Sequence, residues 1–273
     1  MNLWTICRFE LRNMTRQRSF YTFLLLWVVV MSLVILIQQN IPNFGNYTNV
    51  TGTMFNLILY LLPLLTLVLS SFSITNERES GQWKLLLSYP VSSWEYLIGK
   101  FLGQFIAQWI ILTGSLGFTV GLSPLFGVPL TFTWVLAVYL FAILLLFFFL
   151  LLGMLVGVQS ATRWQALMRS IAIWFVLIMI WPIILISVLS FLPYPMIESA
   201  MKVILFINPA EWIRVWMVIQ LNGGAVFGQT YDALFQSFQS WNGWLLLVVY
   251  MLVYTSLIGF ITKWMMERNK THG

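Results

Sequence analysis

Residues 77–100 hold the group of charged side chains whose types and spacing are best suited to binding another molecule. In this interval, ERESGQWKLLLSYPVSSWEYLIGK, charge returns between two uncharged stretches, residues 19–76 and residues 101–162. A sequence that confines its charge in this way is arranged around a membrane. The interval therefore indicates a part of the chain that leaves the membrane to meet another molecule. Its charged residues are Glu77, Arg78, Glu79, Lys84, Glu95 and Lys100.

The sequence offers little for catalysis. Its one histidine, His272, is in the tail, and no nucleophile–base set or carboxylate cluster is visible. The phosphate-binding pattern G-x-x-x-x-G-K-[ST] is missing, so we expect no nucleotide hydrolysis by this chain. A single cysteine excludes an internal disulfide, and no M-x-x-M or C-x-x-C offers soft ligands for copper. We therefore expect no catalytic residue, no metal site and no cofactor bound by this chain, and we disfavour an intramembrane enzyme.

The composition is that of a membrane protein. Of the 273 residues, 60% are apolar and 8% are charged, whereas soluble domains carry about 25% charged residues. The basic residues do not alternate with aromatic residues on a polar surface, so we expect no nucleic-acid partner. No charged residue lies deep within an apolar run, and ion-coupled transporters and pumps usually need one there. The chain is therefore predicted to depend on a partner for energy, or to be passive.

Six apolar stretches are long enough to cross a bilayer as helices. We predict an all-α polytopic membrane protein that forms a single transmembrane domain over residues 1–273. Before the first span, residues 2–17 read as an amphipathic interfacial helix, because Leu3, Cys7, Leu11 and Met14 share one stripe and Arg8, Arg12 and Arg16 share another. The alternative is a simple basic flank that sets orientation. The predicted spans are about 20–38, 54–74, 97–121, 132–158, 170–192 and 243–265.

Residues 193–242, between spans five and six, are predicted to form short external helices that lie on or dip into the outer leaflet. Asn208 is a helix cap followed by Pro209 and Glu211. Residues 231–241 carry an apolar stripe at helical spacing. Within the spans, Gly117–Gly121 and Gly153–Gly157 are small-x-x-x-small pairs, which we expect to serve close packing inside the bundle.

The orientation follows from the distribution of Lys and Arg among the loops. The N-terminus, the loops after spans two and four, and the tail together hold 12 basic residues. The opposite side holds Lys202 and Arg214. Both termini are therefore predicted to be cytoplasmic.

With that orientation, residues 77–96 form a cytoplasmic region between spans two and three. Gly81 is predicted to end the preceding helix, residues 82–89 to form a short helix, and Pro90 to end it. Ser92-Ser93-Trp94-Glu95 matches a capping box that starts the next helix. A short helix held between two long ones is a lever geometry, and a plain connecting loop is the alternative.

This interval resembles the signature of ABC-2-type transporter permeases, through Glu77-Arg78-Glu79-x-Gly81, Leu86-Leu87, Pro90-Val91-Ser92 and Lys100. Six spans, cytoplasmic ends and an N-terminal interfacial helix are also similar to that family. The resemblance implies a coupling helix that docks on a cytoplasmic ATPase, which binds ATP and magnesium. The coupling residues it implies are Glu77, Arg78, Glu79, Gly81, Leu86, Leu87, Pro90 and Ser92.

The chain length and the Asn208-Pro209…Arg214 segment resemble the branch of this family that serves nitrous-oxide reductase maturation. That resemblance implies a homodimer with two ATPase subunits, an external β-helical repeat partner, and a part in building a copper–sulfur centre in the bacterial cytoplasmic (inner) membrane. It implies external docking by Asn208, Pro209, Glu211 and Arg214. Export of an antimicrobial peptide, a drug or a lipid is an alternative, as is a non-transporting scaffold for a soluble complex.

Overall fold

The computed structural model describes residues 3–38, 49–81, 92–127, 130–221 and 241–271, which are helical apart from short connections and contain no strand. The prediction of an all-α polytopic membrane protein is confirmed. The helices are α1 (Leu3–Arg16), α2 (Arg18–Gln38), α3 (Asn49–Glu79), α5 (Ser93–Leu122), η1 (Ser123–Phe126), α6 (Phe132–Gln159), α7 (Arg163–Trp174), η2 (Phe175–Ile180), α8 (Trp181–Ser190), α9 (Tyr194–Ile207), α10 (Pro209–Gln220) and α12 (Trp241–Thr271).

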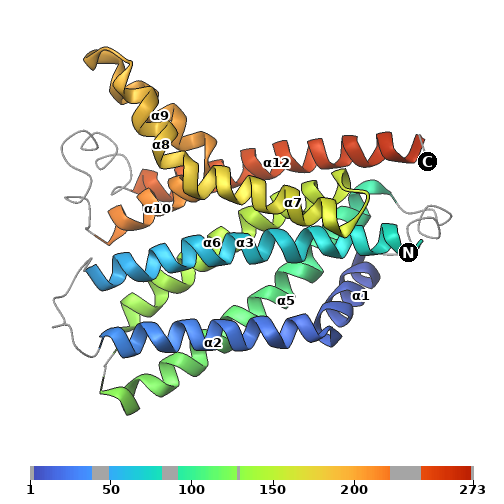
Figure 1. The fold of residues 1–273 in the computed structure, drawn as a ribbon, viewed down its shortest axis with the longest axis horizontal. Helices are drawn as coiled ribbons and strands as arrows, with labels where there is room; N and C mark the ends of the chain where they lie inside the picture. Colours follow the sequence, from blue (N-terminus) through green and yellow to red (C-terminus); the bar gives the residue numbers. More distant parts are fainter. Residues whose placement is uncertain (1–2, 39–48, 82–91, 128–129, 222–240, 272–273) are drawn as a thin grey trace.

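The long helices α2, α3 and α12 run along the length of the molecule, and both chain termini lie at the same end of it (Figure 1). We call this the termini end. It also holds α1, the last turn of α3 and the beginnings of α5 and α7, whereas α9, α10 and the beginning of α12 lie at the opposite end (Figure 1). The described parts of the predicted coupling and external regions therefore lie at opposite ends of the bundle.

Five of the described helical segments are long and apolar enough to cross a membrane: 52–79, 93–125, 132–159, 163–190 and 243–268. The predicted first span is α2, whose 21 residues are about 30 Å long and match a hydrocarbon core. Counting α2 gives the six spans expected from the sequence. The segments Ser199–Ile207 and Pro209–Gln220 meet at 115°, so α9 and α10 form a sharply bent pair, as the predicted dipping helices would.

Helix α6 is the centre of the bundle, because it is apolar on all sides and contacts α3, α5, α10 and α12. Its pair Gly153–Gly157 packs directly on α3. A Cβ added at Gly153 would lie 2.6 Å from Cβ of Ser70, and one at Gly157 would lie 2.9 Å from Cβ of Ile74. The hydroxyl of Ser70 also donates to the carbonyl of Leu150 at 3.1 Å. Close approach of two backbones and a hydrogen bond between helices are the forces expected inside a bilayer.

The structure corrects two details of the sequence reading. A Cβ at Gly117 or Gly121 would meet no atom within 4 Å, so among the described residues this pair makes no close helix contact. The predicted loop over residues 159–169 is shorter, because Thr162 caps α7 by accepting a hydrogen bond from the amide of Gln165. The first turn of α7 is polar, and its composition alone does not distinguish it from a loop.

Candidate functional site

A buried cluster of charges lies near the termini end and is centred on Lys100 of α5. The ammonium group is 3.0 Å from Oε2 of Glu10 and 2.9 Å from Oε1 of Glu77, and Lys100 is 1% exposed. It also donates to the hydroxyl of Ser73 at 2.6 Å. That hydroxyl in turn donates to Glu10, and the Tyr96 hydroxyl donates to Oε2 of Glu77 at 2.6 Å. One cation thus joins α1, α3 and α5 through groups that are 90 and 23 residues away along the chain.

Two glycines of α5 allow α1 to reach this cluster. A Cβ added at Gly99 would lie 2.8 Å from Cβ of Ile6, and one at Gly103 would lie 2.8 Å from the carbonyl oxygen of Cys7 and 2.7 Å from Cβ of Glu10. No larger side chain fits without moving α1. The pair Gly99–Gly103 is therefore the contact that seats the N-terminal helix on the third span.

The buried face of α1 differs from the predicted stripe. Ile6, Cys7, Glu10 and Met14 are buried, so a carboxylate lies within the face expected to be apolar. Glu10 is tolerated in this buried face because Lys100 of α5 pairs with its carboxylate. Burial, with a smaller contribution from Glu10, raises the pKa of the Cys7 thiol above its usual value, so the thiol stays protonated while α1 is seated.

The two residues after Glu77 each contact a different helix. Arg78 donates to the carbonyl oxygens of Val158 at 2.8 Å and Ser160 at 3.0 Å, at the C-terminal end of α6. Glu79 accepts from the backbone N–H of Arg163 at 2.6 Å and pairs with its guanidinium Nε at 3.0 Å, at the beginning of α7. A cation at a helix C-terminus and a carboxylate at a helix N-terminus both stabilise the helix dipole.

Successive side chains of a helix point about 100° apart. Three consecutive residues at the end of α3 can therefore contact three different helices. Glu77 reaches α5 and, through Lys100, α1; Arg78 reaches α6; Glu79 reaches α7. We call Glu77, Arg78, Glu79, Lys100 and Glu10 the hub. The last turn of α3 is thereby connected to four other helices.

The described residues on either side of 82–91 lie beside the hub. Gly81 has φ 73°, a left-handed conformation that favours glycine, and it follows the end of α3 as predicted. Ser92 forms the predicted capping box: its hydroxyl accepts from the amide of Glu95 at 3.1 Å, and its own amide donates to Glu95 Oε2 at 3.2 Å. The predicted short helix over 82–89, with Leu86, Leu87 and Pro90, lies outside the described residues, as does the stripe over 231–240.

At the opposite end, the Asn208–Arg214 segment is largely buried. The Asn208 side chain caps α10 through the amide of Ala210 at 3.0 Å and donates to the carbonyl of Leu177 at 2.6 Å. Leu177 lies in η2, a π-helical turn within span five, where carbonyls are displaced from the regular ladder. Glu211 and Arg214 form an ion pair at 2.6 Å. The residues predicted for docking thus contact one another and their own bundle, and Arg214 keeps a partly exposed side chain.

Sequence reasoning singled out Glu77, Arg78, Glu79 and Lys100 but missed Glu10 and Tyr96 as their partners. A signal for Glu10 existed, because a carboxylate that breaks an apolar face requires a buried cation. The cation could not be identified from spacing alone, since Lys100 is 90 residues away. For Tyr96 no signal separates it from the other tyrosines.

Comparison with known proteins shows the family of the chain. Residues 4–261 match the family model described as ABC-2 family transporter protein. The chain is 28% identical over 241 residues to a probable ABC transporter permease protein NosY of Pseudomonas aeruginosa, covering 81% of this chain and 82% of the relative. It is 24% identical over 228 residues to a probable ABC transporter permease protein NosY of Stutzerimonas stutzeri, with the same coverage of 81% and 82%. Since the family model spans nearly the whole sequence, this chain belongs to the ABC-2 family of transporter proteins.

Proposed function

We propose that the chain is the permease subunit of an ATP-driven ABC-2 exporter and that the hub passes force from an ATPase to the spans. The observation that carries this proposal is the last turn of α3, where Glu77, Arg78 and Glu79 contact three different helices directly. Residues 82–91 connect this turn to the beginning of α5. A movement of that segment would act on both helices, and through Lys100 also on α1.

The buried charges favour a role in transmission over a role in stability. Lys100 and Glu10 are each 1% exposed, and removing charges from water costs about as much as their attraction returns. A well-packed apolar cluster would hold α1, α3 and α5 together at least as well. Directional ion pairs, however, require a defined alignment of the three helices, so they move together or separate as a unit. We propose that this alignment changes when ATP is hydrolysed.

The partner ATPase is proposed to dock on the cytoplasmic region over residues 77–96. Membership of the ABC-2 family implies an ATPase subunit, and the ATP and magnesium would be bound there. The termini end then faces the cytoplasm, in agreement with the distribution of basic residues. The proposed coupling residues are Glu77, Arg78, Glu79, Gly81, Leu86, Leu87, Pro90 and Ser92.

The complete transporter is proposed to be a homodimer with two ATPase subunits in the bacterial cytoplasmic membrane. Native mass spectrometry of the complex purified in lipid nanodiscs tests this composition. A mass that corresponds to two permeases and two ATPases is expected. A stable complex of one permease and one ATPase would contradict it.

We further propose that the transporter supports assembly of the copper–sulfur centre of nitrous-oxide reductase. The similarity to two proteins named as probable NosY permeases supports this assignment, together with the Asn208-Pro209…Arg214 segment. An external repeat protein would dock near Arg214. In a strain with a deletion of this gene, we expect the reductase to be made without its normal copper–sulfur absorption and activity, and complementation to restore both. A reductase with normal spectrum and activity would favour a peptide, drug or lipid exporter.

The coupling role is tested by Glu77→Ala and Gly81→Pro in the complex with its ATPase. Proline cannot adopt the φ of 73° found at Gly81. Both permease variants are expected to insert into the membrane and to bind the ATPase. The rate of ATP hydrolysis, however, should no longer change when the variant permease is present. Glu267→Ala is the matched control, because Glu267 lies at the same end on α12 in a half-exposed pair with Lys263. Wild-type coupling in both test variants would mean that residues 77–96 are only a connector.

A membrane scaffold without transport is distinguished by ATP turnover. An exporter is expected to hydrolyse ATP faster when its substrate is supplied to the reconstituted complex. A constant rate across candidate substrates, with the reductase phenotype still present in the deletion strain, would favour the scaffold.

A further inference from the structure

Two amides on α5 continue the polar face that begins at Lys100. Gln104 is fully buried and Gln108 is 5% exposed, and spacings of four residues place all three on one side of the helix. Among the described residues, neither polar atom of the Gln104 amide has a hydrogen-bond partner, and Nε2 of Gln108 has none. An amide buried in a membrane without a partner is strongly unfavourable, because hydrocarbon cannot replace water.

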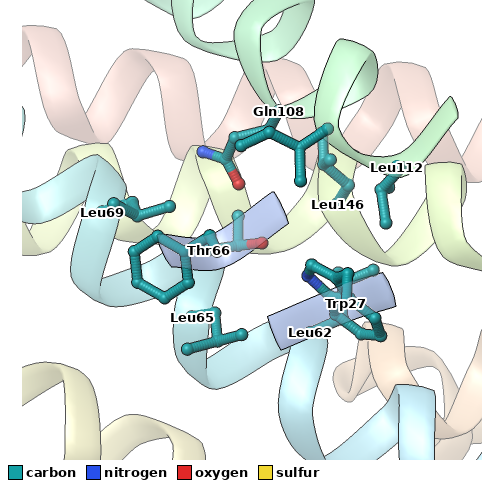
Figure 2. A pocket seen from close by; sticks show the side chains of 10 residues that line it. Trp27, Leu62, Leu65, Thr66, Leu69, Gln108, Leu112 and Leu146 are labelled. Carbon is teal, nitrogen blue, oxygen red and sulfur yellow. The ribbon is translucent and has the colours of Figure 1, made fainter. Parts of the chain in front are cut away.

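A small cavity lies next to Gln108 and is lined by residues of α2, α3, α5 and α6. Its volume is about 20 Å³, and one water molecule needs about 10–15 Å³. The amide of Gln108 and the hydroxyl of Thr66 lie across this space, with Trp27, Leu62 and Leu112 around them (Figure 2). Thr66 is 2% exposed, so buried polar side chains on α3 and α5 both line a space large enough for one water molecule.

We propose that this cavity is a hydration site within the membrane-spanning bundle, where bound water joins the amide of Gln108 to Thr66. The bound water donates to the amide oxygen of Gln108, which points toward Thr66 (Figure 2), and accepts from the Thr66 hydroxyl. A buried water usually makes about three hydrogen bonds, and the two polar side chains supply sites for them. An empty cavity would have an apolar lining throughout, whereas the amide of Gln108 and the hydroxyl of Thr66 line this one.

The position of Gln104 extends the inference toward the hub. It lies one helical turn from Gln108 and one turn from Lys100, and its amide lacks partners at both atoms among the described residues. The polar face of α5 therefore leads from the ion cluster near the termini end to the cavity. This inference is independent of the proposed function, since it concerns the bundle in any role.

Hydroxyl-radical footprinting by X-ray radiolysis tests the site, because radicals formed from a bound water oxidise the side chains beside it. Trp27, which is 4% exposed, reports the cavity in the full-length permease in nanodiscs. Trp216 is the control: it is fully buried and its indole N–H donates to the carbonyl of Gly243 at 3.2 Å. We expect oxidation of Trp27 well above that of Trp216. Equal, low oxidation of both would overturn the proposal.

Variants that remove the polar lining sharpen the test. Gln108→Leu and the nearly isosteric Thr66→Val are each expected to lower Trp27 oxidation toward the level of Trp216. Protection of Cys7 from alkylation, measured in parallel, establishes that the bundle is still assembled. With that protection intact, unchanged oxidation of Trp27 in both variants would show that water bound to these groups is not its source.

Discussion

The two ends of the bundle both bury charge, but they use it over different distances in the sequence. At the termini end, Lys100 pairs with Glu10, 90 residues away, and Arg78 and Glu79 reach groups that are 80 and 84 residues away. At the opposite end, Asn208 caps a helix two residues on, and Glu211 pairs with Arg214 three residues on. The first arrangement ties four helices to α3 through charged side chains, whereas at the opposite end the ion pair is local and the amide of Asn208 reaches span five at Leu177.

The two ends of the bundle also differ in the packing around their charged groups. Near the bend, Trp212 stacks on Tyr250 of α12 with centroids 4.5 Å apart, and Trp216 packs edge-on against Trp244 at 4.9 Å. These aromatic pairs adopt the stacked and edge-to-face geometries that aromatic rings prefer, and they carry no charge. At the hub, ion pairs of about 3 Å depend on alignment. If the proposed function is correct, we therefore expect movement to be transmitted at the termini end, where charged side chains join the helices, and the opposite end to be held mainly by packing.

The largest effect is expected for Lys100→Met. This change leaves Glu10 and Glu77 buried and facing one another without a cation, and breaking a buried pair costs about 3–5 kcal/mol. We expect a large loss of thermal stability in nanodiscs. Lys263→Met is the control, since the Lys263 pair with Glu267 is partly exposed. Similar thermal stability in the two variants would mean that the buried ion pairs of Lys100 contribute no more to stability than the partly exposed pair of Lys263.

A smaller effect is expected when α1 is displaced without a change of charge. In Gly103→Ala the new methyl group would lie 2.7–2.8 Å from Glu10 and Cys7, and such overpacking costs about 1–3 kcal/mol. Cys7 is 2% exposed, and its raised pKa keeps the thiol unreactive at neutral pH. We expect faster alkylation of Cys7 by a maleimide in this variant.

The matched control for that change is Gly117→Ala on the same helix. A Cβ at Gly117 meets nothing within 4 Å, so we expect wild-type alkylation and a slight gain in helix stability. Equal alkylation of Cys7 in the two variants would contradict the role of Gly99–Gly103 in seating α1.

At the opposite end, Asn208→Ala is expected to cost about 1–2 kcal/mol through loss of the α10 cap. The carbonyl of Leu177 also loses its donor. Because the bend is held by packing and not by the hub, the ratio of ATP turnover to export should stay unchanged in a reconstituted complex. Lower stability together with lost coupling would show that both ends transmit movement.

The smallest effect on stability is expected for Glu79→Gln. The Glu79 and Arg163 side chains are 34% and 53% exposed, and exposed pairs contribute about 0–1 kcal/mol. We therefore expect near wild-type thermal unfolding. A marked loss of ATPase binding in the same variant would place Glu79 at the docking surface, whereas unchanged binding would limit its role to orienting α7.

Much of the architecture could be predicted because it depends on local chemistry. The Ser92–Glu95 capping box and the Asn208 cap follow from hydrogen bonds within three residues, and both are present. Gly153–Gly157 was correctly predicted to pack inside the bundle, but Gly117–Gly121 has the same pattern, and a Cβ added at either glycine would meet no described residue of another helix within 4 Å. Small residues permit the close approach of another helix, but the sequence pattern does not say whether a helix packs there. The tertiary structure decides this.

By itself, the sequence determined the membrane-spanning helices, the sharp confinement of charge and the helix boundaries around residues 81 and 92. These depend on hydrophobicity, helix capping and the φ preference of glycine, which act over a few residues. Only the tertiary structure brought Glu10, Glu77 and Lys100 together, directed three successive residues to three helices, and left Gln108 facing a cavity. Those outcomes depend on which helices become neighbours, because a buried charge or amide is tolerated only where another element supplies its partner.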